Sequence, residues 1–344
     1  MAFAQTCPAE PLRLAVFNTE LSRDGPGLLF RDITRKAPDV SAAADRIVRA
    51  SPDVLLLLDV DYDAGLLAAK SFARLIRETG GPDFAYLFAL LPNRGMPTGV
   101  DMNGDGRLGT PKDAQAYGRY SGQGGMVLLS RFPVQIAEVQ NFTDVLWADL
   151  DWATLPEQDG KPFLSPQALA QQRLSRTGHW IVPVQLPDGQ RISLLLFHAT
   201  PPAFDGPEDL NGLRNADEIR FWLRILNSFP KTPVATMGVT NLDPLQGDGR
   251  REVAWDLLSH PRIQDPFAHL PANERHTVDW SDIGLGQMRT DILLPGSDLI
   301  VLNQGAVWPE MRDETESRHA LIWVDVELPG PDHPAMLELS AANE

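Results

Sequence analysis

The stretch GGMVLLSRFPV, Gly124–Val134, contributes most to the prediction of the fold. Its centre, Met126–Ser130, is a short and mainly apolar run of the length expected for a β-strand. Upstream of it, Val54–Leu58 is apolar at every position, which predicts a strand buried on both faces. Seven more runs of this kind occur before and after these two, at Leu12–Phe17, Trp180–Val184, Ile192–Phe197, Pro233–Met237, Asp291–Leu294, Leu299–Leu302 and Leu321–Val326.

Helices are predicted between several of these strands. Ser41 is a candidate N-cap for a helix that ends at Ala50, and Gly65–Glu78 and Glu218–Leu226 carry apolar residues at helical spacing. Some strands are thus separated by helices whereas others follow each other directly, which predicts mixed sheets. We expect a four-layered α/β/β/α sandwich, in which two mixed β-sheets pack face to face between layers of helices.

The composition is that of a single globular domain. The chain has 344 residues with neither an internal repeat nor a low-complexity linker, and 43% of them are hydrophobic, enough for a large core. We assign residues 12–330 to the domain and residues 1–11 and 331–344 to terminal tails. No apolar run approaches the roughly 18 residues that a membrane span needs.

Charge and the N-terminus bear on partners and location. The formal net charge of −16 disfavours binding to bulk nucleic acid, which needs Lys and Arg contacts to phosphates, although a local basic cleft is compatible with it. The one cysteine, Cys7, excludes an intrachain disulfide. Met1–Gln5 contains an Ala-x-Ala pattern that resembles the end of a signal peptide, which predicts a secreted or periplasmic bacterial protein. An ordinary chain terminus is the alternative interpretation.

Two long segments interrupt the regular pattern. Residues 92–124 are rich in Gly, Asp and Pro, and residues 142–178 contain the polar stretch Pro156–Lys161. Long loops on a rigid scaffold often frame a binding cleft, and covering a sheet edge is the alternative.

The first of these segments also contains a candidate calcium loop. Asp101, Asn103 and Asp105 have the D-x-N-x-D-G spacing in which alternate oxygens converge on one ion and glycine permits the tight turn. Lys112 stands at the twelfth position, where such loops carry a bidentate Glu. A Ca²⁺ site and a metal-free turn both remain open.

Polar residues gather at the ends of the predicted strands, where they would emerge together at one rim of the sheets. A single residue of this kind is usually a hydrogen-bonding group that ends a strand, but several such ends together favour a functional site. The residues are Asn18, Asp59, His198, Asn241, Asp291 with Arg289 before it, and Arg318 with His319.

The order of these motifs resembles the endonuclease/exonuclease/phosphatase superfamily, which has the deoxyribonuclease-like fold. The resemblance runs from about Leu12 to Leu328 and is closest to bacterial exported proteins with a long Asp/Gly loop after the second strand, which are described as extracellular nucleases or phytase-like phosphatases. Its motifs are FN at Phe17-Asn18, DVLLLLDVDYD at Asp53–Asp63, GGMVLLSRFPV at Gly124–Val134, LLFHATP at Leu195–Pro201, MGVTNLDP at Met237–Pro244, MRTDILLP at Met288–Pro295 and SRHALIWV at Ser317–Val324.

The resemblance implies metal-assisted hydrolysis of a phosphate ester, with Mg²⁺ or another divalent cation held by carboxylates. By position, Asn18 and Asn241 would hold phosphate or orient the site, and His198 would contact the phosphate. Asp291 and His319 would form a carboxylate–imidazole pair. The implied ligand is a small phosphorylated or otherwise anionic molecule.

Three positions depart from the family pattern. Asp59 replaces the metal-binding Glu and is one methylene shorter. Val239 replaces the Asp that orients water, and valine can neither accept a proton nor hold a water molecule. Arg318 replaces a metal-linked Asp and reverses its charge, so it would repel a metal, bind phosphate or pair with Asp59.

Two functions follow from these substitutions. One is a phosphoric-ester hydrolase whose turnover is weakened at Val239 and Arg318, with Asp61 or Asp243 as alternative sources of a carboxylate. The other is a catalytically inactive descendant that binds a phosphorylated or anionic ligand through His198, His319 and their neighbours. Metal-stimulated turnover discriminates between the two.

Overall fold

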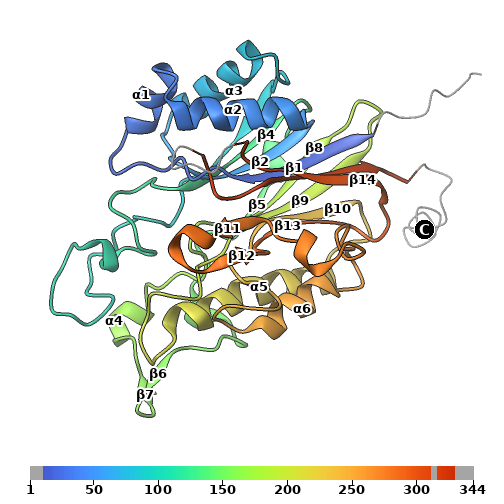
Figure 1. Cartoon of the computed structure of the whole chain (residues 1–344). Coiled ribbons are helices and arrows are strands. Elements are labelled where there is room, and N and C mark those ends of the chain that lie inside the picture. The colour runs from blue at the N-terminus through green and yellow to red at the C-terminus, as the bar shows by residue number, and fades with distance from the viewer. Residues whose placement is uncertain (1–10, 311–315, 330–344) are drawn as a thin grey trace, which may run out of the picture.

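The computed structural model describes residues 11–310 and 316–329, so the Met1–Gln5 pattern and Cys7 lie outside the described residues, as do the predicted tails apart from Pro11. Figure 1 shows α1–α3 on one side of two stacked sheets and α5 and α6 on the other. The predicted four-layered α/β/β/α sandwich is therefore confirmed. No described helix combines the length and apolar character needed to cross a membrane.

The first sheet has six strands in the order β14-β15-β1-β2-β4-β3. β1 and β2 are parallel, whereas β15 and β4 pair antiparallel with them, so the sheet is mixed. The central strands are apolar on both faces because helices cover one side and the second sheet covers the other. Their bounds are β1 Leu12–Asn18, β2 Val54–Val60, β3 Tyr86–Phe88, β4 Gly125–Ser130, β14 Ile300–Val307 and β15 Leu321–Glu327.

The second sheet has five strands in the order β13-β10-β9-β8-β5. β9 and β10 are parallel, and β13 and β8 pair antiparallel on either side of them. The bounds are β5 Gln140–Asn141, β8 His179–Gln185, β9 Arg191–His198, β10 Val234–Val239 and β13 Asp291–Pro295. Two short hairpins lie outside the large sheets, namely β6 Glu157–Gln158 with β7 Lys161–Pro162, and β11 Val278–Trp280 with β12 Gly286–Met288.

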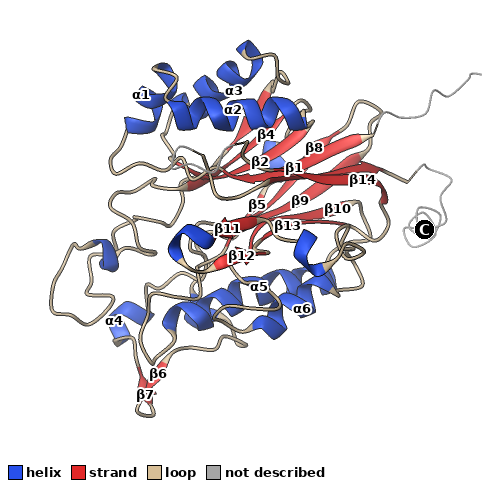
Figure 2. Cartoon of the chain, viewed as in Figure 1, coloured by secondary structure: helices blue, strands red, loops and turns tan. Residues whose placement is uncertain are grey.

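The core is divided among three apolar layers. Leu14 and Leu56 of the first sheet pack against Leu194 and Met237 of the second, and further clusters lie beneath each helical layer. Figure 2 shows the helices on the two outer faces of the sheets. They are α1 Leu28–Thr34, α2 Pro38–Ala50, α3 Leu67–Glu78, α5 Leu210–Ser228 and α6 Arg251–Leu258, with the short α4 Pro166–Leu169 apart from them.

The structure differs from the sequence prediction mainly at helices. The prediction that Ser41 caps a helix is wrong, because α2 begins at Pro38 and the Ser41 hydroxyl donates to Lys36 O. Proline suits the first helical position because the backbone N–H there has no partner within the helix. The predicted helix at Glu218–Leu226 begins earlier, at Leu210, and α1 and α6 were not predicted.

Candidate active site

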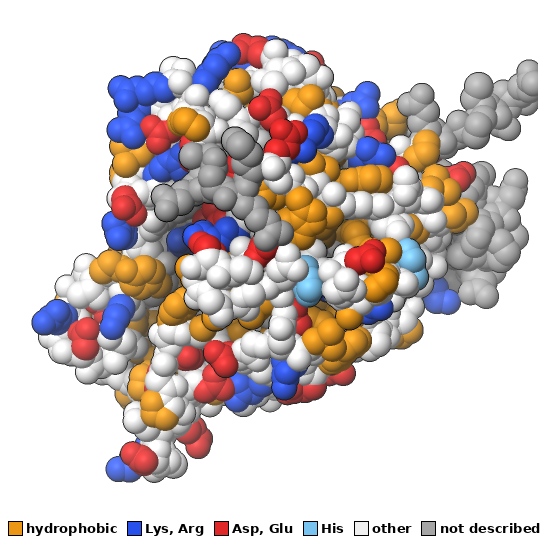
Figure 3. Space-filling view, in the orientation of Figure 1, with side chains coloured by type: hydrophobic (Ala, Val, Ile, Leu, Met, Phe, Trp, Pro, Cys, Tyr) orange, Lys and Arg blue, Asp and Glu red, His pale blue; other side chains and the backbone are white. Residues whose placement is uncertain are grey.

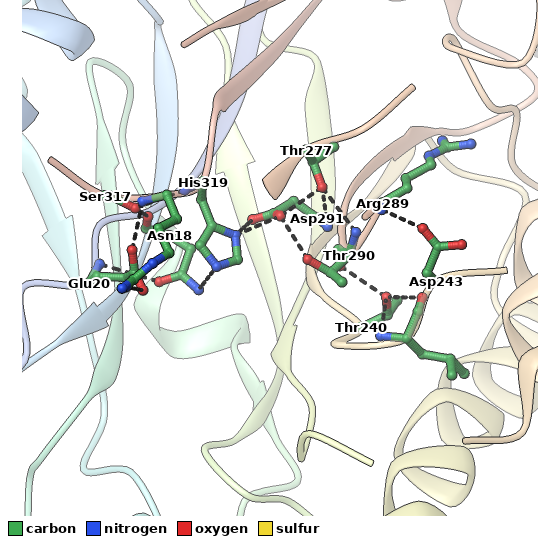
Figure 4. Close-up of polar contacts among 12 residues, drawn as sticks. Asn18, Glu20, Thr240, Asp243, Thr277, Arg289, Thr290, Asp291, Ser317 and His319 are labelled. Carbon is green, nitrogen blue, oxygen red and sulfur yellow. Dashed lines mark hydrogen bonds and ion pairs between the residues drawn. The ribbon is translucent and has the colours of Figure 1, made fainter. Parts of the chain in front are cut away.

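Three buried side chains form a chain of polar contacts across the rim of the two sheets. Figure 4 shows Asn18, His319 and Asp291 in line. The His319 Nδ1 atom lies 2.8 Å from Asp291 Oδ2, and Nε2 lies 3.2 Å from the Asn18 amide nitrogen. Asn18 ends β1 of the first sheet and Asp291 begins β13 of the second, so His319 joins the two sheets. This geometry brings together three residues predicted from the sequence.

Neighbouring side chains fix the Asp291–His319 pair. The Thr277 and Thr290 hydroxyls donate to Asp291 Oδ2 at 2.8 and 3.1 Å. Arg46, fully buried on α2, donates to the backbone carbonyl of His319 at 2.6 Å. Burial opposes protonation of His319, but the contact with Asp291 outweighs it and raises the His319 pKa. The pair is thus a buried imidazole and carboxylate that neighbouring hydrogen bonds hold in place.

Val239 lies in register between two polar residues of this rim. In the second sheet it pairs with His198 of β9 on one side and with Asp291 of β13 on the other. Its side chain is completely buried and belongs to the apolar cluster between the sheets. An isopropyl group therefore occupies the position between the imidazole and the carboxylate where a water-orienting Asp was expected from the resemblance.

A bulge at the end of β2 displays Asp59. Leu58 pairs with Met126 and Val60 with Gly125, so Asp59 is the extra residue between two consecutive pairs. Its φ of 56° lies in the left-handed region, which Asp tolerates better than most residues. The Asp59 carboxylate forms an ion pair with the Arg94 guanidinium.

Gly124 leaves room for this ion pair. Its φ is 57°, and an added Cβ would lie 1.9 Å from Arg94 Nη1 and 2.5 Å from Asp59 Oδ1. Asp61 holds the Gly124 backbone in place, because its carboxylate accepts N–H groups from Gly124 and Arg23. Asp61 is therefore occupied by backbone donors, and burial raises its pKa.

A second arginine approaches from the other long segment. Arg176 Nη1 donates to His198 Nε2 at 3.1 Å, which places the remaining ring proton of a neutral His198 on Nδ1. No described residue accepts a hydrogen bond from this buried Nδ1. Burial, then the charges of Arg176 and Arg94, lower the His198 pKa well below its usual value, so the ring is neutral.

Glu218 on α5 supports this second arginine. Its buried carboxylate accepts the backbone N–H of Arg176 at 2.5 Å and that of Thr200 at 2.6 Å. One side chain thus ties together the segments that carry Arg176 and His198. Burial and the neighbouring Arg94 lower the Arg176 pKa to about 9, so the guanidinium remains a cation at neutral pH.

Arg318 pairs with carboxylates other than Asp59. Its guanidinium pairs with Asp282 at 2.6 Å and with Glu20 at 3.4 Å, and the side chain is 40% exposed. The alternative in which it pairs with Asp59 is wrong, because the loop between β11 and β12 places Asp282 within reach while Arg94 already pairs with Asp59. Its predicted role in binding phosphate stays a prediction.

The two residues that follow β10 have different surroundings. Asn241, with a φ of 51°, donates its amide to Ala199 O at 2.8 Å, which places it beside the strand end that carries His198. Asp243 accepts backbone N–H groups from Leu245 and Arg289. Figure 4 shows it on the far side of Arg289 from His319. Asp243 therefore organises the loop, as Asp61 does on the other sheet.

The residues present do not fit a divalent cation beside Asp59, because the Arg94 guanidinium already occupies its carboxylate. At about 4 Å and an effective dielectric near 20, such a cation and a divalent ion would repel each other by about 8 kcal/mol. Within residues 11–310 and 316–329, no three His, Cys, Asp or Glu side chains are grouped as a metal site would require.

The Asp101–Asp105 turn satisfies its own carboxylates. Asp101 accepts N–H groups from Gly104 and Gly106, and Asp105 accepts the Asn103 amide and the Arg107 N–H. The four carboxylate oxygens are thus bonded within the loop, whereas the buried Asn103 Oδ1 has no partner among the described residues. Calcium binding there stays a prediction.

The sequence prediction missed both arginines of this site. Arg94 and Arg176 lie at neither a strand end nor a family motif, and they come from segments 92–124 and 142–178, which were expected to frame a cleft. Their isolated placement gave no signal by itself. The sequence did show an arginine in each of two long loops that were expected to frame a cleft beside the polar rim, and this could have pointed to them.

Comparisons with known proteins agree with this fold. A similar crystal structure, an endonuclease/exonuclease/phosphatase from Beutenbergia cavernae, is 17% identical with a TM-score of 0.56, over 94% of this chain and 72% of that one. The human Nocturnin catalytic domain with bound sulfate is 14% identical with a TM-score of 0.53, over 94% and 95% of the two chains. TDP2 of D. rerio with a single-strand DNA product has the same identity and TM-score, over 93% and 100%.

These identities support a shared fold only, and no curated protein is significantly similar in sequence. The sequence model of the Endonuclease/Exonuclease/phosphatase family, however, matches residues 15–319. That range begins within β1 and ends at His319, so it includes every strand end that contributes to the rim. The chain therefore belongs to the Endonuclease/Exonuclease/phosphatase family.

Proposed function

We propose that the protein binds a phosphate ester at the rim formed by Asn18, His198 and His319, and that it hydrolyses such esters far more slowly than an intact family site would. The observation that carries this proposal is the position of Val239 between His198 and Asp291. The imidazole–carboxylate pair that can hold and move a proton is present, whereas the side chain that would aim a water molecule is apolar.

The charge distribution supports a small anionic ligand. On the face shown in Figure 3, acidic and basic side chains are interspersed among the described residues, and the whole chain carries a formal charge of −16. Arg94 and Arg176 concentrate positive charge at the rim. Sulfate in the Nocturnin domain is a tetrahedral anion of the same class, and the DNA product in TDP2 carries phosphates. A small phosphate ester therefore suits this chain better than a long nucleic acid, which needs many Lys and Arg contacts.

Turnover of bis-p-nitrophenyl phosphate, DNA and phytate, with Mg²⁺, Mn²⁺ or Ca²⁺ and with EDTA, tests the proposal. Val239→Asp supplies the missing carboxylate, and Val239→Asn is its matched control because it adds polarity of the same size without a base. We expect Val239→Asp to exceed Val239→Asn by about 10²-fold, the lower range for a general base. Hydrolysis by the unmodified protein as fast as by Val239→Asp would contradict the proposal.

A purely binding role is the second candidate, and the Arg94–Asp59 ion pair favours it, because it occupies the carboxylate that a metal-dependent hydrolase would need. This candidate predicts that a phosphate ester raises the melting temperature while no tested ion stimulates turnover.

Export from a bacterial cell is also proposed. It rests on the Ala-x-Ala pattern of Met1–Gln5, and fractionation of cells that express the full gene tests it. Recovery of the protein from the cytoplasm alone would contradict it.

A further inference from the structure

Two arginines reach the same rim from opposite sheets, and each leaves donors unused. Arg94 contacts Asp59 of the first sheet, and Arg176 contacts His198 of the second. In the described part of the chain, these are the only hydrogen bonds that the two guanidinium groups make. A guanidinium has five N–H donors, so most of the donors on this pair are free to bind a ligand.

A buried imidazole adds to this donor set. His198 is 4% exposed, and its Nδ1 has no partner among the described residues even though Arg176 forces the proton onto it. Arg94 Nε is likewise buried and without a partner there. Buried donors without an acceptor are costly, and they are rare in folded proteins unless a ligand or water satisfies them.

The balance of charge at this point is positive. The charged groups that act on Arg176 are Arg94 and Arg214 as cations and Asp59 and Glu218 as anions, so three guanidinium groups stand against two carboxylates while His198 is neutral. The backbone N–H of Asn93 donates to Thr177 O at 3.1 Å, which holds the segments that carry Arg94 and Arg176 side by side. After burial, the charge of Arg94 is the largest influence that lowers the Arg176 pKa, as expected for two neighbouring cations. An anion placed between them would relieve that repulsion and accept hydrogen bonds from both.

We infer that Arg94, Arg176 and His198 form a metal-independent site for a terminal phosphate group, in which the Arg94 guanidinium takes the place of a divalent cation beside Asp59. This inference rests on the proposed function and assigns its ligand to the phosphate monoesters. A terminal phosphate has three non-bridging oxygens, which match two guanidinium forks and one imidazole N–H, whereas a diester offers two such oxygens and one negative charge.

Titration calorimetry with phenyl phosphate and diphenyl phosphate, in excess EDTA and in excess Mg²⁺, tests the inference. We expect phenyl phosphate to bind more tightly than diphenyl phosphate, with the same dissociation constant in both buffers. Arg94→Ala and Arg176→Ala should each weaken binding by about 10- to 100-fold, the effect of losing a charge-assisted hydrogen bond.

Arg191→Ala is the matched control, since Arg191 begins β9, whose other end carries His198, and forms an exposed ion pair with Glu138. It should leave the dissociation constant unchanged. Arg94→Lys keeps a cation beside Asp59 if Arg94→Ala does not fold, and it should retain part of the affinity because an ammonium lacks the planar fork.

Each outcome separates the inference from the proposed function. Binding of phenyl phosphate that requires Mg²⁺, or equal affinities of Arg94→Ala and Arg191→Ala, would overturn the inference and leave the proposed function standing. Equal binding of the monoester and the diester would overturn the assignment to terminal phosphates. Binding of neither ester in either buffer would refute the proposed function itself.

Discussion

Asp291→Asn gives a direct test of the buried imidazole–carboxylate pair. Asp291 is 1% exposed, and its carboxylate accepts from the His319 ring and from the Thr277 and Thr290 hydroxyls. An amide of the same shape has a single acceptor oxygen, so at least one of these donors loses its partner. Removing one member of a buried ion pair costs about 3–5 kcal/mol, and a neutral hydrogen bond left unmade costs about 1–3 kcal/mol.

The expected loss depends on pH. Because Asp291 raises the His319 pKa in the folded protein, the pair contributes stability that is fully present below the unfolded pKa of about 6.5. That contribution is lost as pH rises through the folded pKa. Asp291→Asn should therefore destabilise the protein by about 3–5 kcal/mol at acidic pH and by about 1–3 kcal/mol at alkaline pH.

Urea unfolding followed by tryptophan fluorescence, at one pH below and one pH above the range in which His319 titrates, measures this difference. Asp243→Asn is the matched control, because Asp243 is also buried at the rim but accepts backbone N–H groups rather than an imidazole. Its cost should be the same at both pH values. An equal cost of Asp291→Asn at both pH values would refute the claim that the pair stabilises a protonated His319.

Two further substitutions probe how the arginines are held. Gly124→Ala should weaken phenyl phosphate binding as much as Arg94→Ala does, because its Cβ would lie 1.9 Å from Arg94 Nη1. Gly104→Ala has a similar positive φ but open space around it, so calorimetry should find its affinity unchanged, and equal losses for the two would exclude the steric explanation. Glu218→Gln should cost about 1–3 kcal/mol in urea unfolding and weaken binding, because an amide cannot accept both backbone N–H groups that align Arg176. Full affinity in Glu218→Gln would show that Arg176 needs no such support.

Much of the fold could be predicted because its strands are buried on both faces. Val54–Leu58 and Ile192–Phe197 are apolar without interruption, and both are central strands of their sheets. The short strands β5 and β6 have two residues each, too few for any periodicity, and they depend on pairing with distant segments. The same holds for the start of α5, where Asp209 in a left-handed conformation precedes the helix without a capping hydrogen bond.

The candidate site could be predicted only where a residue ends a strand. Asn18, His198 and Asp291 lie at one rim because each stands at the end or the start of a strand on the same side of the stacked sheets, a rule that needs no side-chain detail. The direction of Arg318 could not be predicted, because it is set by Asp282 on a loop whose position depends on the β11–β12 hairpin. The bulge at Asp59 could not be predicted either, because a bulge depends on the register in which β2 pairs with β4.

The two central departures of this site reinforce each other. A divalent cation contributes to ester hydrolysis by neutralising phosphate and by activating water, and only the first of these can be done by a guanidinium. Arg94 cannot activate a water molecule. Val239 stands where a side chain would orient that water, so this rim could not use an activated water in any case. Under the proposed function, a fixed guanidinium would hold phosphate without being lost to chelators, so we expect the rim to recognise an anion better than it hydrolyses an ester.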